Sequence, residues 1–292
     1  MRSNIILIYN KAWGMTDVPY IVPMGDFFLT NDHFYRDRAA VMIIHMPTLH
    51  SSDPILNWNM KRDDELWVFW SMECEAHRPW QYQPDVLSLF DIMATHKLDS
   101  DIPVPYLDVR YLESFRRPPC AKTGFVNAFI SSHFNLSKRL ETLEELMKYI
   151  DIHSYGKCMH NYDLVADEGM ATKENVIASY LFTIAFENTV AEDYVTEKFF
   201  QPLEAGSVPI YLGAPNIDEF APGNRCFINV SDFLSIPELA EYLQTLNADP
   251  AAYDSYHAWR TEPLRDTFLA KIDLIATDAL LRLCQKIKMQ FA

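Results

Sequence analysis

The sequence has few cysteines, few cations relative to acids, and no long apolar run. Its 5 cysteines stand far apart in 292 residues, with no Cys-x-x-Cys pair. This spacing argues against a zinc site and a disulfide framework, and it indicates free thiols in a reducing compartment. No stretch approaches the roughly 18 apolar residues of a membrane span. The apolar start at residues 5–9 is too short for a signal peptide and is typical of a buried strand.

The shortage of positive charge excludes whole classes of partner. The formal net charge is -15, whereas a nucleic-acid or anionic-membrane surface needs clustered lysine and arginine. An anionic small ligand is still compatible with this composition, because a few local cations or helix N-termini can hold it. With 49% apolar residues the chain is globular, and its length suits one or two domains.

The clearest break in the chain is Arg116-Arg-Pro-Pro-Cys120, which has the composition of an exposed linker. After it, strand and helix patterns alternate, which predicts a mostly parallel sheet covered on both faces. Such sheets bind ligands beyond the carboxyl ends of their strands. Thr196 and Gly206 are a good N-cap and C′ residue for one of the helices. The predicted strands are 5–9, 40–45, 66–71, 124–131, 150–155, 180–186, 208–212 and 226–230, and the predicted helices are 135–149, 175–179, 197–205, 237–246 and 261–288.

Lys198 lies where an anion could bind. It falls in the first turn of a helix that follows a buried strand, and the helix dipole there prefers carboxylates. A cation at this position is explained by a ligand phosphate, which the unpaired N–H groups of the turn would also bind. The alternative is an ordinary capped turn with Lys198 in solvent, and position does not decide between the two.

Arg139 repeats this arrangement near the start of the helix that follows the strand at 124–131. Arg139 and Lys198 could converge on one diphosphate, because arginine binds phosphate with two parallel hydrogen bonds and lysine acts as a point charge. The alternative is that Arg139 pairs with Glu141 on the surface, where ion pairs contribute little.

Glu73 directly follows a predicted strand and has aromatic residues around it, including Trp70. A carboxylate shielded by aromatic rings has a raised pKa, which suits a general base, and aromatic rings also stack on sugars. Glu75 and His77 lie in the same segment and are further candidates for contacts to an acceptor. The alternative is a surface acid on a loop.

Three ordered stretches resemble the signature of the α1,3-fucosyltransferases. They are Phe186-Glu-Asn188, Asp193-Tyr-Val-Thr-Glu-Lys198 and the run from Ala205 to Asn216. The likeness is strongest to the plant-type branch, through Glu-Lys-Phe-Phe-Gln201 and Gly213-Ala-Pro-Asn-Ile-Asp-Glu-Phe-Ala-Pro222. Weaker likenesses lie at 98–106, 130–139 and 155–158, so that roughly residues 65–235 are covered.

The resemblance implies an α/β fold of the GT-B type, with two facing Rossmann-like domains, a parallel sheet in each, and a C-terminal helix. We expect an acceptor-binding domain at 1–117 and a GDP-fucose-binding domain at 121–260. A helical segment at 261–292 could pack back on the first domain. The implied activity is inverting transfer of L-fucose from GDP-fucose to O3 of a GlcNAc or glucose unit in an oligosaccharide or glycan.

The resemblance also implies roles for individual residues. Glu73 falls where the family has the glutamate proposed as base, but here the tripeptide reads Glu73-Cys74-Glu75, so Glu75 is a rival. Arg139 and Lys198 would stabilise the diphosphate. The other implied donor contacts are Asn188 and Tyr194 to phosphate or sugar hydroxyls, Glu197 to ribose or the fucosyl cation, and Glu187 to guanine or ribose.

No cofactor is expected beyond GDP-fucose as donor, and a divalent metal is not essential, since the cations take its role. Asp99-Ser-Asp101 has the spacing of a metal clamp but lies in the acceptor half. A transferase with another nucleotide-sugar donor and a non-catalytic glycan-binding relative are the alternatives. The expected location is the cytoplasm for a full-length bacterial-type protein and the Golgi lumen for a trimmed eukaryotic one.

Overall fold

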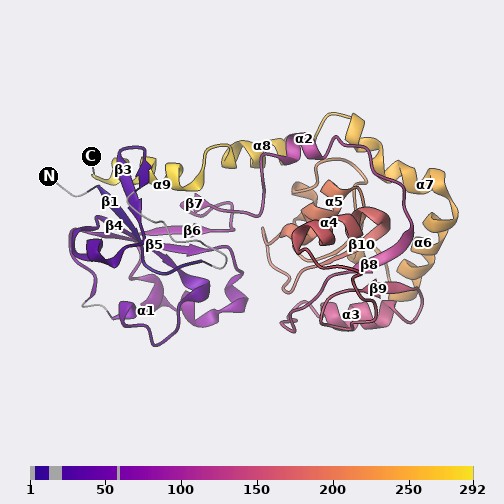
Figure 1. The fold of residues 1–292 in the computed structure, drawn as a ribbon, viewed down its shortest axis with the longest axis horizontal. Helices are drawn as coiled ribbons and strands as arrows, with labels where there is room; N and C mark the ends of the chain where they lie inside the picture. Colours follow the sequence, from indigo (N-terminus) through magenta and orange to yellow (C-terminus); the bar gives the residue numbers. More distant parts are fainter. Residues whose placement is uncertain (1–3, 13–21, 58–59, 292) are drawn as a thin grey trace. The chain divides into compact units, whose positions relative to one another are not determined.

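The computed structural model describes residues 4–12, 22–57 and 60–291, which form two compact units (Figure 1). The first unit is Met1–Pro105 with Leu274–Ala292, and the second is Tyr106–Asp273. The predicted linker at Arg116 therefore lies inside the second unit. The Arg116 guanidinium donates to the carbonyl of Arg260 at 2.9 Å, and Arg260 donates to the carbonyl of Phe115 at 2.9 Å. These reciprocal bonds fasten the linker to the segment around Arg260.

The described part of the first unit contains a seven-stranded sheet in the order β2-β3-β1-β4-β5-β6-β7. All neighbouring strands are parallel except β2 and β3, which are antiparallel. The strands are β1 (Ile5–Ile8), β2 (Val22–Met24), β3 (Phe27–Thr30), β4 (Val41–His45), β5 (Leu66–Ser71), β6 (Ile92–Thr95) and β7 (Ile102–Pro103), and the helices are α1 (Pro84–Leu87) and α9 (Ala279–Phe291).

Each face of this sheet packs its own apolar layer. Helix α9 covers one face with Leu283, Cys284 and Ile287, and its Lys286 pairs with Asp101 at 2.7 Å. Trp67 belongs to the layer on the other face. Because successive side chains of a strand point to opposite faces, β5 contributes alternately to the two layers.

The second unit has a parallel five-stranded sheet in the order β12-β11-β10-β8-β9. Helices α3 and α6 cover one face, and α4 and α5 pack together against β10 on the other (Figure 1). The strands are β8 (Gly124–Ala128), β9 (Ile152–Ser154), β10 (Tyr180–Phe186), β11 (Val208–Leu212) and β12 (Ile228–Asn229). The helices are α2 (Tyr111–Ser114), α3 (Arg139–Leu146), α4 (Met170–Ser179), α5 (Glu197–Ala205), α6 (Ile236–Ala248), α7 (Pro250–Asp254) and α8 (Asp266–Ile275). The division of the chain into the two units falls within α8.

Two parallel-sheet α/β units and a C-terminal helix confirm the predicted fold class. The strands β5, β10 and β11 have the predicted bounds. The Thr196 side chain caps α5 by accepting from the N–H of Lys198, and Gly206 ends the helix at φ 79°, as predicted. These features depend on neighbours within a turn or a strand, which is why sequence patterns capture them.

Three predicted helices differ from the structure by more than two residues. The helix predicted at 175–179 is α4, which begins at Met170. The helix predicted at 261–288 is two helices, because Asp278 accepts hydrogen bonds from the N–H groups of Leu280 and Leu281 and so caps α9. Thr261 is not an N-cap, since it ends a 3-10 helix, Ser255–Thr261. The helix predicted at 135–149 begins only at Arg139, after Lys138 with φ 59°. Strands β2, β3, β6 and β7 were not predicted.

No helix among residues 4–12, 22–57 and 60–291 is both long and apolar enough to cross a membrane. All five cysteines fall in these ranges and are free, and four of them are buried. The prediction of free thiols is confirmed.

Candidate functional site

The order of strands in the second unit marks one place for a ligand. The chain runs from β8 outward to β9 and then returns to β10 on the other side of β8. Parallel α/β sheets bind ligands at the carboxyl edge where the strand order reverses in this way. Here the loops after β8 and β10 are joined: the N–H of Ser137 donates to the carbonyl of Asn188 at 3.1 Å, and the Ser137 hydroxyl donates to the carbonyl of Glu187 at 2.5 Å. The predicted donor residues lie on and around these joined loops.

Glu187 directly follows β10 and is 0% exposed. One carboxylate oxygen accepts from the N–H of Thr196 at 2.7 Å and the other from the Thr196 hydroxyl at 2.9 Å. A Cβ at Gly213 would lie 2.7 Å from the Glu187 Cγ, so a side chain there would displace the carboxylate. Burial raises the pKa of Glu187, and Lys198 and Thr196 oppose this rise. Its position suits holding the loop rather than meeting a ligand from solvent.

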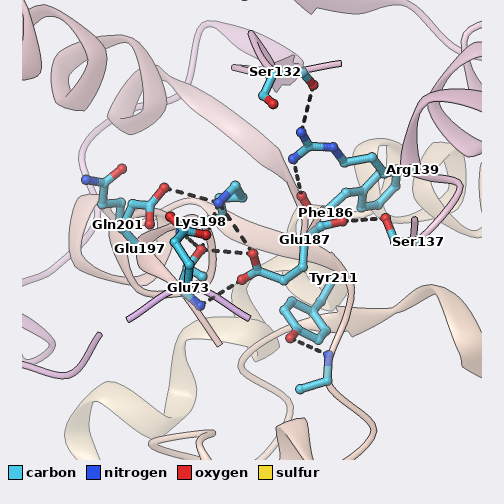
Figure 2. Close-up of polar contacts among 12 residues, drawn as sticks. Glu73, Ser132, Ser137, Arg139, Phe186, Glu187, Glu197, Lys198, Gln201 and Tyr211 are labelled. Atoms are coloured by element: carbon cyan, nitrogen blue, oxygen red, sulfur yellow. Dashed lines mark hydrogen bonds and ion pairs between the residues drawn. The ribbon is translucent and has the colours of Figure 1, made fainter. Parts of the chain in front are cut away.

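Lys198 has three partners within the protein, and 22% of its side chain is exposed. Its Nζ donates to Thr196 Oγ1 at 2.9 Å. It also donates to Glu197 Oε1 at 3.2 Å and lies 3.4 Å from Glu187 Oε2 (Figure 2). Burial lowers the pKa of Lys198, but Glu187 and Glu197 outweigh burial and leave it raised. Lys198 is therefore a charged lysine held beside two carboxylates, and the alternative of a lysine in solvent is wrong.

Glu197 is the more accessible of the two carboxylates, with its side chain 40% exposed. Burial raises the pKa of Glu197, yet the charges of Lys198 and then Lys173 outweigh it, so the pKa is lowered. Glu197 is consequently an ionised group that accepts hydrogen bonds and can face a positive charge, and it is poorly suited to donate a proton.

Arg139 is the first residue of α3 and is only 2% exposed. Its two terminal nitrogens donate to the carbonyls of Phe186, at 3.3 Å, and Ser132, at 2.8 Å, while its Nε is buried with no hydrogen-bond partner in the described residues. Burial lowers the pKa of Arg139. It is not a surface ion pair with Glu141, whose carboxylate accepts from the side chain of Asn135 at 2.6 Å.

The structure thus brings the two predicted cations to one place. Arg139 binds the carbonyl of Phe186, and Lys198 pairs with the carboxylate of the next residue, Glu187. Two positive groups from different helices, α3 and α5, meet at the carboxyl end of β10. A pair of cations beside the N-terminus of α5 has the charge that suits an anion such as a diphosphate.

Asn188 and Tyr194, predicted as donor contacts, lie in the loop after β10. The Asn188 Oδ1 is buried with no hydrogen-bond partner in the described residues. Tyr194 is buried, and its ring makes an edge contact with Tyr106 at 6.3 Å between centroids. Asp193, for which no role was predicted, exchanges two hydrogen bonds with the Asn216 side chain and so joins the loops after β10 and β11.

Glu73 in the first unit follows β5 and has its side chain 19% exposed, so it is not a fully solvated acid. Its N–H donates to Ser71 Oγ at 3.2 Å, its carboxylate lies 3.7 Å from His77 Nδ1, and the Tyr82 hydroxyl reaches its carbonyl at 3.5 Å. Glu75 differs, because its side chain is 47% exposed and forms an ion pair with Lys97. Glu73 and His77 thus form one cluster, with Glu75 turned to another partner.

The Trp70 side chain does not belong to the cluster formed by Glu73 and His77. Its side chain packs on the face covered by α9 and lines a cavity of about 190 Å³ with Asn10 and His45. Burial lowers the pKa of His45 to about 4, so its imidazole is neutral. Ser71, which binds the N–H of Glu73, points from β5 to the opposite face from Trp70, as strand alternation requires.

No cluster of three or more metal-ligating side chains occurs within the stretches of chain that the structure describes. Asp101, half of the predicted Asp-x-Asp spacing, has one oxygen on Lys286 at 2.7 Å and the other on the N–H of Met93 at 2.8 Å. The Asp101 carboxylate therefore links α9 to strand β6 of the same unit.

Sequence reasoning missed Lys173 and Gln201. The Nζ of Lys173 donates to Gln201 Oε1 at 2.8 Å, and its charge acts on Glu197. It was missed because the helix was predicted to begin at Asn175, whereas α4 begins at Met170, after Gly169 with φ 73°. The signal in the sequence for the earlier helix start was Gly169, because glycine readily adopts the positive φ found before α4.

Comparison with known proteins gives concordant matches along the chain. The family model for the C-terminal part of glycosyltransferase family 10 (fucosyltransferase) matches residues 119–291, and that for the fucosyltransferase N-terminal part matches residues 1–107. A fucosyltransferase-like protein of Arabidopsis thaliana is 41% identical over 197 residues, covering 67% of this chain and 37% of that protein. This relative agrees with the predicted likeness to the plant-type branch.

Animal relatives match as well. The human GDP-fucose protein O-fucosyltransferase 3 is 34% identical over 66% of this chain and 44% of its own length. The chicken protein of the same name is 33% identical over 80% of this chain and 52% of its own length. The chain therefore spans about half, or less, of these relatives.

Solved structures agree in fold. A crystal structure of an alpha1,3-fucosyltransferase with GDP-fucose matches with a TM-score of 0.60 at 16% identity, covering 95% of this chain and 90% of that one. A crystal structure described simply as an alpha1,3-fucosyltransferase matches with a TM-score of 0.63 at 18% identity, over 96% and 92%. Together with the family matches along both units, these likenesses place the chain in glycosyltransferase family 10, the fucosyltransferases.

Proposed function

We propose that this chain transfers L-fucose from GDP-fucose to O3 of a GlcNAc or glucose unit, with inversion at the sugar carbon. The observation that supports this most is the meeting of Arg139 and Lys198 around Phe186 and Glu187, at the reversal point of a parallel sheet. A buried arginine beside a partly exposed lysine is the kind of cation pair that a pyrophosphate requires. Family membership supplies the identity of the sugar nucleotide.

On the donor side, the chemistry is charge stabilisation. As the bond between the fucosyl C1 and the β-phosphate oxygen breaks, its electron pair leaves with GDP, and negative charge grows on the diphosphate. Lys198, Arg139 and the N-terminus of α5 stabilise that charge. Asn188 and Tyr194 bind phosphate or sugar hydroxyls, and the ionised Glu197 faces ribose hydroxyls or the positive charge that develops on the fucosyl ring.

On the acceptor side, Glu73 is the general base. The acceptor oxygen forms its bond to C1 from the face opposite GDP, and the hydroxyl proton passes to the Glu73 carboxylate. The contact between Glu73 and His77 keeps the carboxylate beside a second polar group, whereas the ion pair with Lys97 makes Glu75 the weaker candidate. Trp70 and its cavity lie on the other face of the sheet and suit a more distant part of the acceptor.

We propose that no divalent metal is required. The cations at the end of β10 occupy the role that a metal has in many nucleotide-sugar transferases, which is to neutralise the departing diphosphate. GDP-fucose is the donor substrate, and no further cofactor enters the proposal.

A protein hydroxyl is a second candidate acceptor. The human and chicken relatives are named as protein O-fucosyltransferases, and they are 34% and 33% identical to this chain. A serine or threonine hydroxyl would lose its proton to the same base and attack the same carbon. The relatives named here come from eukaryotes, and we accordingly favour the Golgi lumen over the cytoplasm as the location.

The test is an acceptor array with GDP-fucose, read by mass spectrometry. It contains lactose, N-acetyllactosamine, the chitobiose core and a folded protein with exposed serine and threonine. We expect a mass increase of one fucose on at least one acceptor, and a GDP-induced rise in melting temperature that UDP does not give. A melting temperature that UDP raises and GDP leaves unchanged would point to another donor. GDP binding without transfer or donor hydrolysis would point to a non-catalytic relative.

A further inference from the structure

Lys173 approaches the cation site from a third helix. It lies in the first turn of α4, where its Nζ donates to Gln201 Oε1 at 2.8 Å and lies 5.8 Å from the centre of the Phe129 ring. Gln201 is four residues after Glu197 on α5, and residues with this spacing share one face of a helix. The ammonium group is therefore presented to the face of α5 that carries Glu197.

The charged groups at this place are of both signs. Arg139, Lys173 and Lys198 are positive, and Glu187 and Glu197 are negative. Among these five groups the cations outnumber the carboxylates, in a protein whose formal net charge is -15; Glu174, the exposed neighbour of Lys173 in the sequence, acts on Lys173 as well. Lys173 therefore adds to the positive charge that a diphosphate meets beside Arg139 and Lys198.

A phosphate that binds Lys198 competes with the partners that Lys198 already has. Its ammonium has three N–H groups, and Thr196, Glu197 and Glu187 surround them. Glu187 is fully buried and bound by Thr196, whereas the Glu197 side chain is 40% exposed and can turn away. Once released, the Glu197 carboxylate needs another cation, and Lys173 already acts on it.

We propose that Lys173 is a positioning residue of the donor site, which holds Glu197 when a nucleoside diphosphate draws Lys198 away and which adds positive charge to the site. This inference rests on the proposed use of GDP-fucose. Through Lys173, helix α4 takes part in donor binding. The charge of Lys173 keeps Glu197 ionised after Lys198 has turned to phosphate.

The experiment separates the charge of Lys173 from its hydrogen bond. Lys173→Gln keeps a donor for Gln201 and removes the charge, while Lys173→Arg keeps the charge. Lys148→Gln is the matched control, since Lys148 is an exposed lysine of the same unit that pairs with Glu145. GDP affinity is measured by calorimetry at low and high salt, beside the melting temperature without ligand.

We expect Lys173→Gln to weaken GDP binding by about tenfold and to reduce its salt dependence, because one screened attraction has been removed. Lys173→Arg should bind within about threefold of the wild type, and Lys148→Gln should bind as the wild type does. Unchanged GDP affinity in Lys173→Gln would overturn the inference. The inference would also be overturned if Lys173→Arg lost GDP affinity as Lys173→Gln does and if both variants had a lowered melting temperature. A wild-type protein that does not bind GDP would instead overturn the proposed function.

Discussion

The Nζ of Lys198 lies 3.4 Å from Oε2 of Glu187, and both groups are fixed to Thr196. Glu187 follows the central strand β10, and Lys198 belongs to the first turn of α5, so this contact ties the strand end to the helix start. Its consequence is a lysine that stays charged without a ligand and whose position is already set. A diphosphate that binds here therefore meets a lysine that is already charged, and only its contact with the more exposed Glu197 has to change.

Replacing Glu73 with glutamine should lower turnover by about 100-fold or more, because the acceptor hydroxyl loses its base. GDP binding should be retained, since the donor residues lie on the other unit. Initial rates with the best acceptor and calorimetry with GDP measure the two effects. Glu75→Gln is the control, and if it alone abolishes turnover while Glu73→Gln does not, the base has been misassigned.

Replacing Lys198 with alanine should weaken GDP binding by about tenfold or more, because a partly buried charge-assisted contact is lost. Arg139→Ala should weaken GDP binding too and should also lower the melting temperature, since the guanidinium holds the carbonyls of Phe186 and Ser132. Lys148→Ala is the control for both variants. GDP affinity equal to that of the wild type in either variant would remove that residue from the site.

Adding EDTA should leave most of the fucosyl transfer intact, because fixed cations rather than a metal stabilise the leaving diphosphate in the proposed mechanism. Rates before and after chelation, and after adding back magnesium or manganese, measure this. Loss of all activity on chelation, with recovery on adding metal, would contradict the proposal.

The stability of the protein should fall as the pH is lowered from about 6.5 towards about 3 because of His257. Burial, with Arg260 and Lys122 nearby, lowers the pKa of His257 from 6.5 to about 3. In this window the unfolded chain binds a proton at His257 and the folded chain does not, so the free energy of unfolding decreases as the pH falls, by up to about 1.4 kcal/mol per unit. Urea unfolding of the wild type and His257→Gln at several pH values tests this. The variant should have the shallower acid slope, and parallel slopes would contradict the assignment.

Several features of the site were determined by local sequence. Thr196 caps α5 because its hydroxyl reaches a backbone N–H two residues ahead, and Gly206 ends α5 because it tolerates a positive φ. The strand β10 and the charged loop after it were also predicted from the chain alone. Such features depend on residues that are neighbours in the sequence.

Other features required the order of the strands and the packing of helices. Glu187 was predicted to contact guanine or ribose; in the structure its carboxylate is buried and bound by Thr196, and Gly213 of the loop after β11 lies against its Cγ. Trp70 and Glu73 stand three residues apart, and the structure directs the tryptophan to the face that packs on α9.

The sequence by itself determined the fold class, the family and the segments that carry the charged residues, since periodicity and ordered motifs are properties of the chain. The tertiary structure decided which charges meet. Arg139, Lys173 and Lys198 come from three helices, and they are brought together only because the strand order places those helices around the carboxyl end of β10. Electrostatic attraction depends on distance in space, and distance along the sequence does not predict it.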